Sequence, residues 1–309
     1  MSKFFNRTQK VSDMPVERPV KPVNALNVDE LLETINRSVD DQLAGVATAL
    51  PESSVAALQA ASQTSSVGVV EFPTNGYRQV RVPRTPRKLY FPEDEVMPAP
   101  PALEAYRSFR TRLLRAQTRR PFRTLAVVSL AQADGKTLTS ANLALVCSQL
   151  PQFPVLLIDG DLRTHGASRC IGHDENPGLS EVLSGQASRE EAVVATDIPN
   201  LHFLSAGDAM KPPPELFSGT RWAEFISWCR EKFKLTIVDC PPAFGMADFE
   251  LISASCEAIL VIARARATSR KGLGKLLAQM DNHKLLGVAL NDVRHYDTSH
   301  YYYYGPRKK

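Results

Sequence analysis

The sequence of 309 residues lacks long hydrophobic runs, and no uncharged apolar stretch reaches the about 18 residues that a membrane-spanning helix needs. The N-terminal residues "MSKFFNRTQKVSDMPVERPV" also lack an apolar stretch of signal-peptide length. Both absences argue against a membrane-embedded or exported protein. We therefore expect a cytoplasmic location.

Paired cysteines are missing as well. The sequence has five cysteines, and their scattered positions match neither a disulfide framework nor a metal-binding motif. We expect reduced, buried thiols at Cys147, Cys170, Cys229, Cys240 and Cys256.

A strong charge bias is also absent, because the formal net charge is only +4. The basic end "GPRKK" and Arg294 together supply too few cations to follow a nucleic-acid backbone. We therefore expect no nucleic-acid partner. The hydrophobic content of 43% is typical of a globular protein with a core.

Glycine is scarce and proline abundant in the first third of the chain. Twelve of the 22 prolines lie at or before Pro121, where the chain has only three of its 16 glycines. We predict a largely irregular N-terminal extension and proline-rich linker over 1–101. Leucines and an isoleucine at near-helical spacing favour an amphipathic helix within 24–50, and disorder is the alternative there.

The hydrophobic pattern of the sequence changes after Ala102. The apolar runs "TLAVVSL", "VLLIDGD", "LHFLSAG", "LTIVDCP", "AILVIAR" and "LLGVALN" alternate with helical stretches. Near-continuous apolar strands between helices are typical of a parallel sheet covered on both faces. We predict a doubly wound, mostly parallel α/β domain over 102–294 and a flexible tail over 295–309. Ligands of such sheets bind beyond the carboxyl ends of the strands.

The first of these strand ends carries a phosphate-binding pattern. In "VVSLAQADGKTLTSANLAL" a strand, a turn with Gly135, Lys136 and Thr137, and a helix follow one another, as in a P-loop. The full pattern needs glycine at position 130, where this chain has Leu130. Taken alone, the match leaves an ordinary helix start as an alternative.

Carboxylates follow two later strands. "VLLIDGDLR" places Asp159 and Asp161 at one strand end, with Arg163 beyond them, and "LTIVDCPP" places Asp239 at another. A single acid of this kind is often a turn or cap residue. Three acids downstream of a G-K-T sequence favour a site for ATP and Mg²⁺, because Mg²⁺ prefers oxygen ligands.

These residues resemble the bacterial tyrosine autokinases of exopolysaccharide and capsule synthesis, a deviant-Walker type of P-loop NTPase. The likeness runs from about Ala102 to the C-terminus. It includes the loop "SLAQADGKT", the second motif "LLIDGDLR", the strand "LTIVDCPP" and a C-terminal tyrosine cluster. The segment "EAYRSFR" also fits the family pattern E-x-x-R-x-x-R.

The resemblance implies an ATP-dependent, Mg²⁺-requiring protein-tyrosine kinase that modifies its own tail in trans. It implies nucleotide contacts at Ala133, Asp134, Gly135, Lys136, Thr137, Leu138 and Arg163. It implies Mg²⁺ ligands, direct or through water, at Thr137, Asp159 and Asp239. It implies catalytic roles for Lys136, Asp159, Asp161 and Asp239. Asp161 is the candidate that assists the tyrosine hydroxyl, and Asp159 and Asp161 could exchange roles.

The resemblance also implies an assembly. Glu104, Arg107 and Arg110 are expected at subunit contacts of a homo-oligomeric ring, although a solvated charged helix face is the simpler interpretation of such residues. The expected phosphate acceptors are Tyr296, Tyr301, Tyr302, Tyr303 and Tyr304. Expected partners are a separate membrane adaptor or polysaccharide co-polymerase, which would hold the protein at the inner membrane, and a phosphotyrosine phosphatase.

The loop departs from the family's usual P-G-E-G-K. This chain has Gln132, Ala133 and Asp134 there, and the loss of glycine at Ala133 is expected to restrict the backbone. Two alternatives therefore stay open: a catalytically weak nucleotide-binding scaffold of a polysaccharide synthase, and a partitioning or positioning ATPase. The latter class usually has lysine where this chain has Ala131, and it lacks a tyrosine tail.

Overall fold

The computed structural model describes residues 76–83, 89–90, 101–209, 211–243 and 247–293. The chain divides into two units, Met1–Thr64 and Ser65–Lys309, and all described residues belong to the second. The helix predicted within 24–50 and the tail predicted over 295–309 lie outside the described residues. Among the described helices, none has both the length and the apolar composition needed to cross a bilayer.

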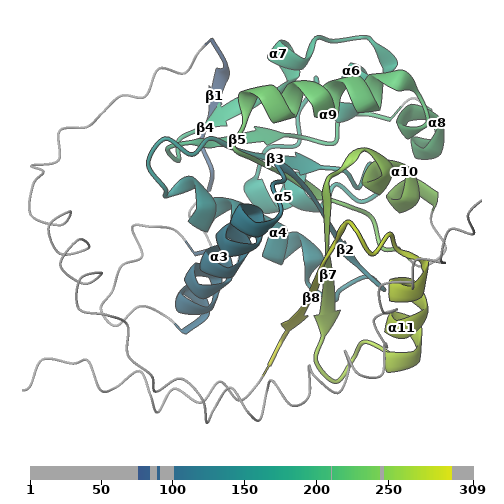
Figure 1. The fold of residues 1–309 in the computed structure, drawn as a ribbon. Helices are drawn as coiled ribbons and strands as arrows, with labels where there is room; N and C mark the ends of the chain where they lie inside the picture. Colours follow the sequence, from purple (N-terminus) through teal and green to yellow (C-terminus); the bar gives the residue numbers. More distant parts are fainter. Residues whose placement is uncertain (1–75, 84–88, 91–100, 210, 244–246, 294–309) are drawn as a thin grey trace, which may run out of the picture. The chain divides into compact units, whose positions relative to one another are not determined.

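An eight-stranded sheet forms the centre of the domain (Figure 1), in the order β1-β4-β5-β3-β6-β2-β7-β8. All neighbouring strands are parallel except β4 and β5, which are antiparallel. The strands are β1 (Arg78–Val80), β2 (Thr124–Ser129), β3 (Val155–Asp159), β4 (Val194–Thr196), β5 (Leu201–Leu204), β6 (Leu235–Asp239), β7 (Ala258–Arg264) and β8 (Leu285–Asn291). The prediction of a mostly parallel sheet is confirmed.

Helices connect the strands. They are α3 (Pro101–Arg119), α4 (Lys136–Ser148), α5 (Gly166–Ile171), α6 (Leu179–Ser184), α7 (Arg189–Ala192), α8 (Pro213–Phe217), α9 (Thr220–Lys232), α10 (Ala247–Ser255) and α11 (Arg270–Gln279). Helix α4 leads from β2 across β6 to β3, whereas α10 leads from β6 across β2 to β7, in the opposite direction. Because such crossovers share one hand, α4 and α10 cover opposite faces of the sheet.

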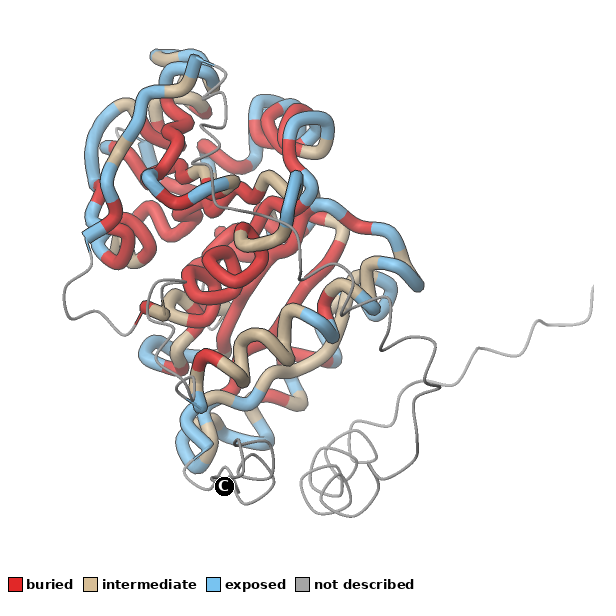
Figure 2. The backbone as a smooth tube through the Cα atoms, turned by 90° about the vertical axis from the view of Figure 1, so that its left-hand side faces the viewer, coloured by how far each residue is buried: buried red, intermediate tan, exposed pale blue. Residues whose placement is uncertain are grey.

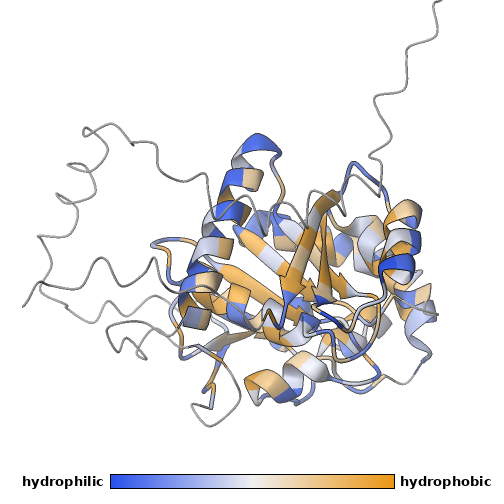
Figure 3. Ribbon diagram, turned by 90° about the horizontal axis from the view of Figure 1, so that it is seen from below, coloured by the Kyte–Doolittle hydropathy of each residue, from blue (hydrophilic) through white to orange (hydrophobic). Residues whose placement is uncertain are grey.

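The central strands are buried on both faces. Every residue of β2, β3 and β6 is buried, and Figure 2 shows buried backbone in the interior of the domain. Their continuous apolar sequences give the hydrophobic colouring of the strands in Figure 3. Burial on both faces removes the alternation that a half-exposed strand would show. It therefore explains why the strands read as continuous apolar runs.

Part of the predicted linker joins the sheet. Strand β1 pairs in parallel with β4, and the fully buried Val82 follows it. The backbone N–H of Val82 donates to Asp197 Oδ1 at 2.9 Å, and the N–H of Tyr90 donates to Asn142 Oδ1 on α4 at 2.9 Å. Residues ahead of 102 thus contact both the edge of the sheet and helix α4.

Candidate nucleotide site

The loop between β2 and α4 forms a turn with two left-handed residues, Ala133 (φ 63°) and Gly135 (φ 96°). Gly135 precedes the first turn of α4 and supplies no side-chain cap for it. The first N–H groups of a helix have no intrahelical partners, and together with the helix dipole they favour an anion. The loop therefore has the backbone arrangement of a phosphate-binding turn.

Lys136 lies between two carboxylates at the carboxyl edge of the sheet. Its Nζ atom is 3.5 Å from Asp161 Oδ2 and 3.5 Å from Asp239 Oδ2, and the lysine is only 7% exposed. Burial alone would lower the pKa of Lys136, but the negative charges of Asp239 and Asp161 outweigh burial and raise it. The ammonium group is thereby kept charged next to the first turn of α4, where its Nζ atom lies 3.4 Å from Thr137 Oγ1.

Asp239 ends β6 and is tied to the first turns of α4. Thr137 Oγ1 donates to Asp239 Oδ2 at 2.7 Å, and Ser140 Oγ donates to Asp239 Oδ1 at 3.1 Å. Full burial raises the pKa of Asp239, while Lys136 and the two hydroxyls oppose this rise. The pair Thr137 and Asp239 places a hydroxyl and a carboxylate oxygen beside each other.

Asp159 ends the neighbouring strand, β3, directly opposite Asp239 in the strand register. Its Oδ2 atom accepts hydrogen bonds from the backbone N–H and the hydroxyl of Ser168, both at 2.7 Å. Burial raises the pKa of Asp159 to about 7, and the nearby Asp239 adds to the rise. Of the two acids in the second motif, Asp161 contacts Lys136, whereas Asp159 is held by α5.

Two further residues expected to contact the nucleotide, Arg163 and Leu138, make other contacts in the structure. The guanidinium of Arg163 contacts Asp248 on α10, with Nε 3.0 Å from Oδ2. Leu138 packs against the hydrophobic core. Both residues therefore have structural contacts that the sequence did not indicate.

The motif expected at subunit contacts lies on α3. Arg107 Nη1 pairs with Glu104 Oε1 at 2.7 Å along the helix. Arg110 Nη1 instead donates to the carbonyl of Val146 at 2.6 Å, near the end of α4. The five expected acceptor tyrosines lie outside the described residues.

Four residues of the site were not predicted from the sequence. Ser140 lies one helical turn after Lys136, so its i,i+4 spacing was a usable signal. Asn291 closes the quoted run "LLGVALN", and its Nδ2 atom donates to the carbonyl of Asp134 at 3.0 Å. Ser168 and Thr268 had no sequence signal, because only folding brings them to Asp159 and Asp134.

The donor set suits magnesium better than a transition metal. Within the described residues no group of three or more His, Cys, Asp or Glu side chains is arranged to hold a metal ion. Mg²⁺ does not need such a cage, because it typically binds one or two carboxylates together with waters and substrate phosphates. The adjacent oxygens of Thr137 and Asp239 fit that requirement.

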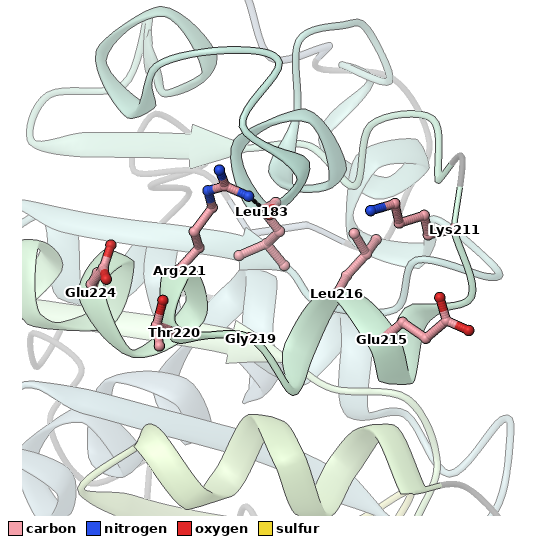
Figure 4. A pocket seen from close by; sticks show the side chains of 8 residues that line it. All are labelled: Leu183, Lys211, Glu215, Leu216, Gly219, Thr220, Arg221 and Glu224. Atoms are coloured by element: carbon pink, nitrogen blue, oxygen red, sulfur yellow. Dashed lines mark hydrogen bonds between the residues drawn. The ribbon is translucent and has the colours of Figure 1, made fainter.

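A hollow of about 540 Å³ lies elsewhere, between α6 and the turn joining α8 to α9 (Figure 4). Lys211, Glu215, Arg221 and Glu224 are among its lining residues. Arg221 Nη1 donates to the carbonyl of Ser184 at 3.3 Å, which caps the end of α6. No residue of the phosphate loop and none of the strand-end aspartates lines this hollow, so it is separate from the nucleotide site.

Comparisons with known proteins identify the family that this chain resembles. The family model described as "AAA domain" matches residues 123–289. The tyrosine-protein kinase ptk of Acinetobacter johnsonii is 33% identical over 195 residues, which are 62% of this chain and 26% of that protein. The tyrosine-protein kinase YwqD of Bacillus subtilis (strain 168) is 29% identical over 206 residues, 66% of this chain and 86% of that protein.

A solved structure shows the same similarity. The kinase domain of the Escherichia coli tyrosine kinase ETK matches with a TM-score of 0.60 at 26% identity, over 71% of this chain and 91% of that domain. The chain spans only about a quarter of the length of the Acinetobacter relative. The similarity to tyrosine kinases is thus concentrated in the α/β domain.

Proposed function

Because the chain belongs to the AAA-domain family of P-loop proteins and its relatives are bacterial tyrosine-protein kinases, we propose that it is an ATP-dependent protein-tyrosine kinase. Its substrate in this proposal is its own C-terminal tyrosine cluster, presented in trans by a neighbouring subunit. One observation carries the proposal: Lys136 contacts carboxylates from two neighbouring strand ends, directly beside a left-handed phosphate-binding turn.

ATP and Mg²⁺ have defined places in this proposal. The N–H groups of the loop and Lys136 hold the β- and γ-phosphates, and Thr137 and Asp239 supply Mg²⁺ ligands. Bound Mg²⁺ would neutralise charge on the phosphate oxygens during transfer. Asp159 is already occupied by two donors from Ser168, so we assign it to hold the site in shape or to act through water.

The reaction is a phosphoryl transfer. The phenolic oxygen of a tyrosine forms a bond to the γ-phosphorus, the bond from that phosphorus to the β–γ bridging oxygen breaks, and ADP leaves. The phenolic proton has a solution pKa near ~10, so a nearby acceptor assists its removal. We assign this role to Asp161, whose carboxylate lies beside Lys136 just beyond the end of β3.

Assembly and location follow from the resemblance. We propose a homo-oligomeric ring with Glu104, Arg107 and Arg110 at its contacts. A separate membrane adaptor or polysaccharide co-polymerase would hold the otherwise cytoplasmic ring at the inner membrane, where it regulates exopolysaccharide or capsule polymerisation and export. A phosphotyrosine phosphatase would reset the tail, since each phosphate adds about −1.5 to −2 charges beside the basic end.

Mass spectrometry tests the proposal. The full chain is incubated with Mg-ATP, with and without a membrane-adaptor segment, and phosphotyrosine is mapped in parallel in a variant with phenylalanine at all five tail tyrosines. We expect the parent to label within the tail and the variant to lose most label. Tyr77→Phe, outside the tail, serves as the control and should label like the parent. ATP binding without any phosphotyrosine in the parent would favour the scaffold instead.

A further inference from the structure

The phosphate loop contains a residue in an unfavourable conformation. Ala133 stands where the resemblance leads us to expect glycine, yet it adopts a left-handed φ of 63°. A side chain with a Cβ atom disfavours this region by roughly 1–2 kcal/mol. Such a conformation persists only where surrounding contacts hold it, so the contacts around Ala133 are informative.

Asp134, the next residue, makes three hydrogen bonds that fix the loop. Its Oδ2 atom accepts from the N–H of Ala131 at 3.0 Å, which closes the turn across Ala133. Its Oδ1 atom accepts from Thr268 Oγ1 at 2.9 Å. Its carbonyl accepts from Asn291 Nδ2 at 3.0 Å, and the whole residue is only 4% exposed.

The two outer partners come from neighbouring strand ends on the far side of the loop. Thr268 follows β7, and its hydroxyl accepts from the N–H of Arg264 at 2.7 Å. This bond leaves the hydroxyl's own hydrogen for Asp134. Asn291 ends β8, and its carbonyl accepts from the N–H of Ala265 at 2.8 Å. The β7 and β8 ends are thereby joined to each other as well as to the loop.

Asn291 also fits against Gly135. A Cβ atom on Gly135 would lie 1.9 Å from Asn291 Nδ2, so the amide occupies the space that the missing side chain leaves. The Asn291 side chain therefore covers Gly135, the second left-handed residue of the loop, and also donates to Asp134. Both left-handed residues, Ala133 and Gly135, flank the one residue on which these contacts converge.

We propose that Asp134, Thr268 and Asn291 form a clamp that positions the loop for nucleotide phosphates and offsets the strain at Ala133. Thr268 and Asn291 are positioning residues, since they act through Asp134 and not on the nucleotide. This inference rests on the proposed nucleotide site and adds residues from two further strands to it. It also explains how the loop keeps its left-handed turn without glycine at position 133.

Thr268→Val tests the clamp, because valine keeps the shape of threonine and removes its hydroxyl. Binding of fluorescent Mg-ADP to the full chain gives the dissociation constant without any need for kinase activity. We expect about tenfold weaker binding, since a buried carboxylate loses a donor and the loop relaxes. Thr268→Ser keeps the hydroxyl and should restore binding to within about twofold of the parent. Thr118→Val, an exposed hydroxyl on α3, is the matched control and should bind like the parent.

A double-mutant cycle separates the clamp from a merely structural role. Ala133→Gly removes the strain, so Thr268→Val should weaken binding only about two- to threefold in that background. Equal weakening in both backgrounds would overturn the link to Ala133. Unchanged binding in Thr268→Val would overturn the clamp itself. A parent chain that binds no Mg-ADP would refute the proposed nucleotide site first, so the two failures are distinguishable.

Discussion

Two groups of acidic and basic side chains in this chain have similar composition and different surroundings. Lys136, Asp161 and Asp239 meet in the interior, where the side chain of each is at most 9% exposed. Glu104 and Arg107 meet on α3 with 31% and 23% exposure. The N–O distance is nevertheless shorter in the partly exposed pair, at 2.7 Å, than in the two buried contacts, at 3.5 Å.

Burial, more than the distance between the charges, decides how much free energy is lost when one charged partner is removed. In water an ion pair is screened, and exposed pairs are worth only about 0.2–1 kcal/mol. Removal of one partner of a buried group leaves an uncompensated charge, which costs far more. The buried group therefore needs all of its members, whereas loss of the partly exposed pair on α3 should cost the single chain less stability.

The largest effect is expected from Lys136→Met. This change removes the lysine charge at the phosphate site and leaves the carboxylates of Asp161 and Asp239 without their shared cation. We expect Mg-ATP turnover to fall by at least about 100-fold, as for loss of one transition-state donor elsewhere. Turnover is measured by ADP release, and circular dichroism checks that the fold survives.

Lys284→Met is the matched control for this change. Lys284 Nζ donates to the carbonyls of Ser253 and Ala254, away from the loop. Its loss should leave turnover within about twofold of the parent. Equal turnover in Lys136→Met and the parent would show that the charge of Lys136 is not needed for ATP turnover.

A smaller effect, on stability, is expected from Ser168→Ala. Ser168 supplies two of the donors to the buried Asp159, and its hydroxyl also accepts from the N–H of Ala206 at 3.1 Å. Loss of the hydroxyl leaves buried polar groups unpaired, so the free energy of unfolding should fall by about 1–3 kcal/mol. Denaturant titration measures this value.

Ser218→Ala is the surface counterpart, since Ser218 Oγ donates to the carbonyl of Glu215 within an exposed turn. A change below about 0.5 kcal/mol is expected there. Similar losses of unfolding free energy in Ser168→Ala and Ser218→Ala would show that burial does not determine the cost of losing a serine hydroxyl.

The strands could be predicted well where burial is continuous. All six apolar runs quoted from the sequence became strands, namely β2, β3, β5, β6, β7 and β8. The short strands β1 and β4 were not predicted, because three residues each give no periodicity and their pairing depends on contacts between distant segments. Sequence patterns thus indicate which segments are buried, but they do not predict short strands whose position depends on tertiary contacts.

The site shows the same division. Lys136, Thr137, Asp161 and Asp239 lie together in the structure, and their roles toward a nucleotide stay a prediction. Arg163 was expected with them, but its contact is Asp248, which is 85 residues away along the chain. The sequence identifies the chemical groups, and it does not determine which neighbour a long side chain selects.

Arg110→Ala gives an intermediate case between the two regions. Its guanidinium donates to the carbonyl of Val146 near the end of α4, so it joins two helices of one chain. We expect a loss of about 0.5–1.5 kcal/mol in the free energy of unfolding. Arg112→Ala, an exposed arginine on the same helix, should change it by less than about 0.5 kcal/mol. Equal losses would mean that the contact with Val146 has no stabilising role.

The smallest effect on stability is expected from the partly exposed pair Glu104 and Arg107 on α3. Replacing Glu104 and Arg107 together by alanine removes an i,i+3 ion pair worth about 0.2–0.5 kcal/mol in an isolated helix. If these side chains also contact a neighbouring subunit, the same change lowers the oligomer mass in light scattering while the melting temperature of the chain barely moves. Arg110 is kept in this variant so that its contact with α4 does not confound the result. The parent should form an oligomer larger than the variant, and the difference should shrink in higher salt as the ionic contacts of Glu104 and Arg107 in the parent are screened. An unchanged oligomer mass would leave Glu104 and Arg107 as a solvated helix face.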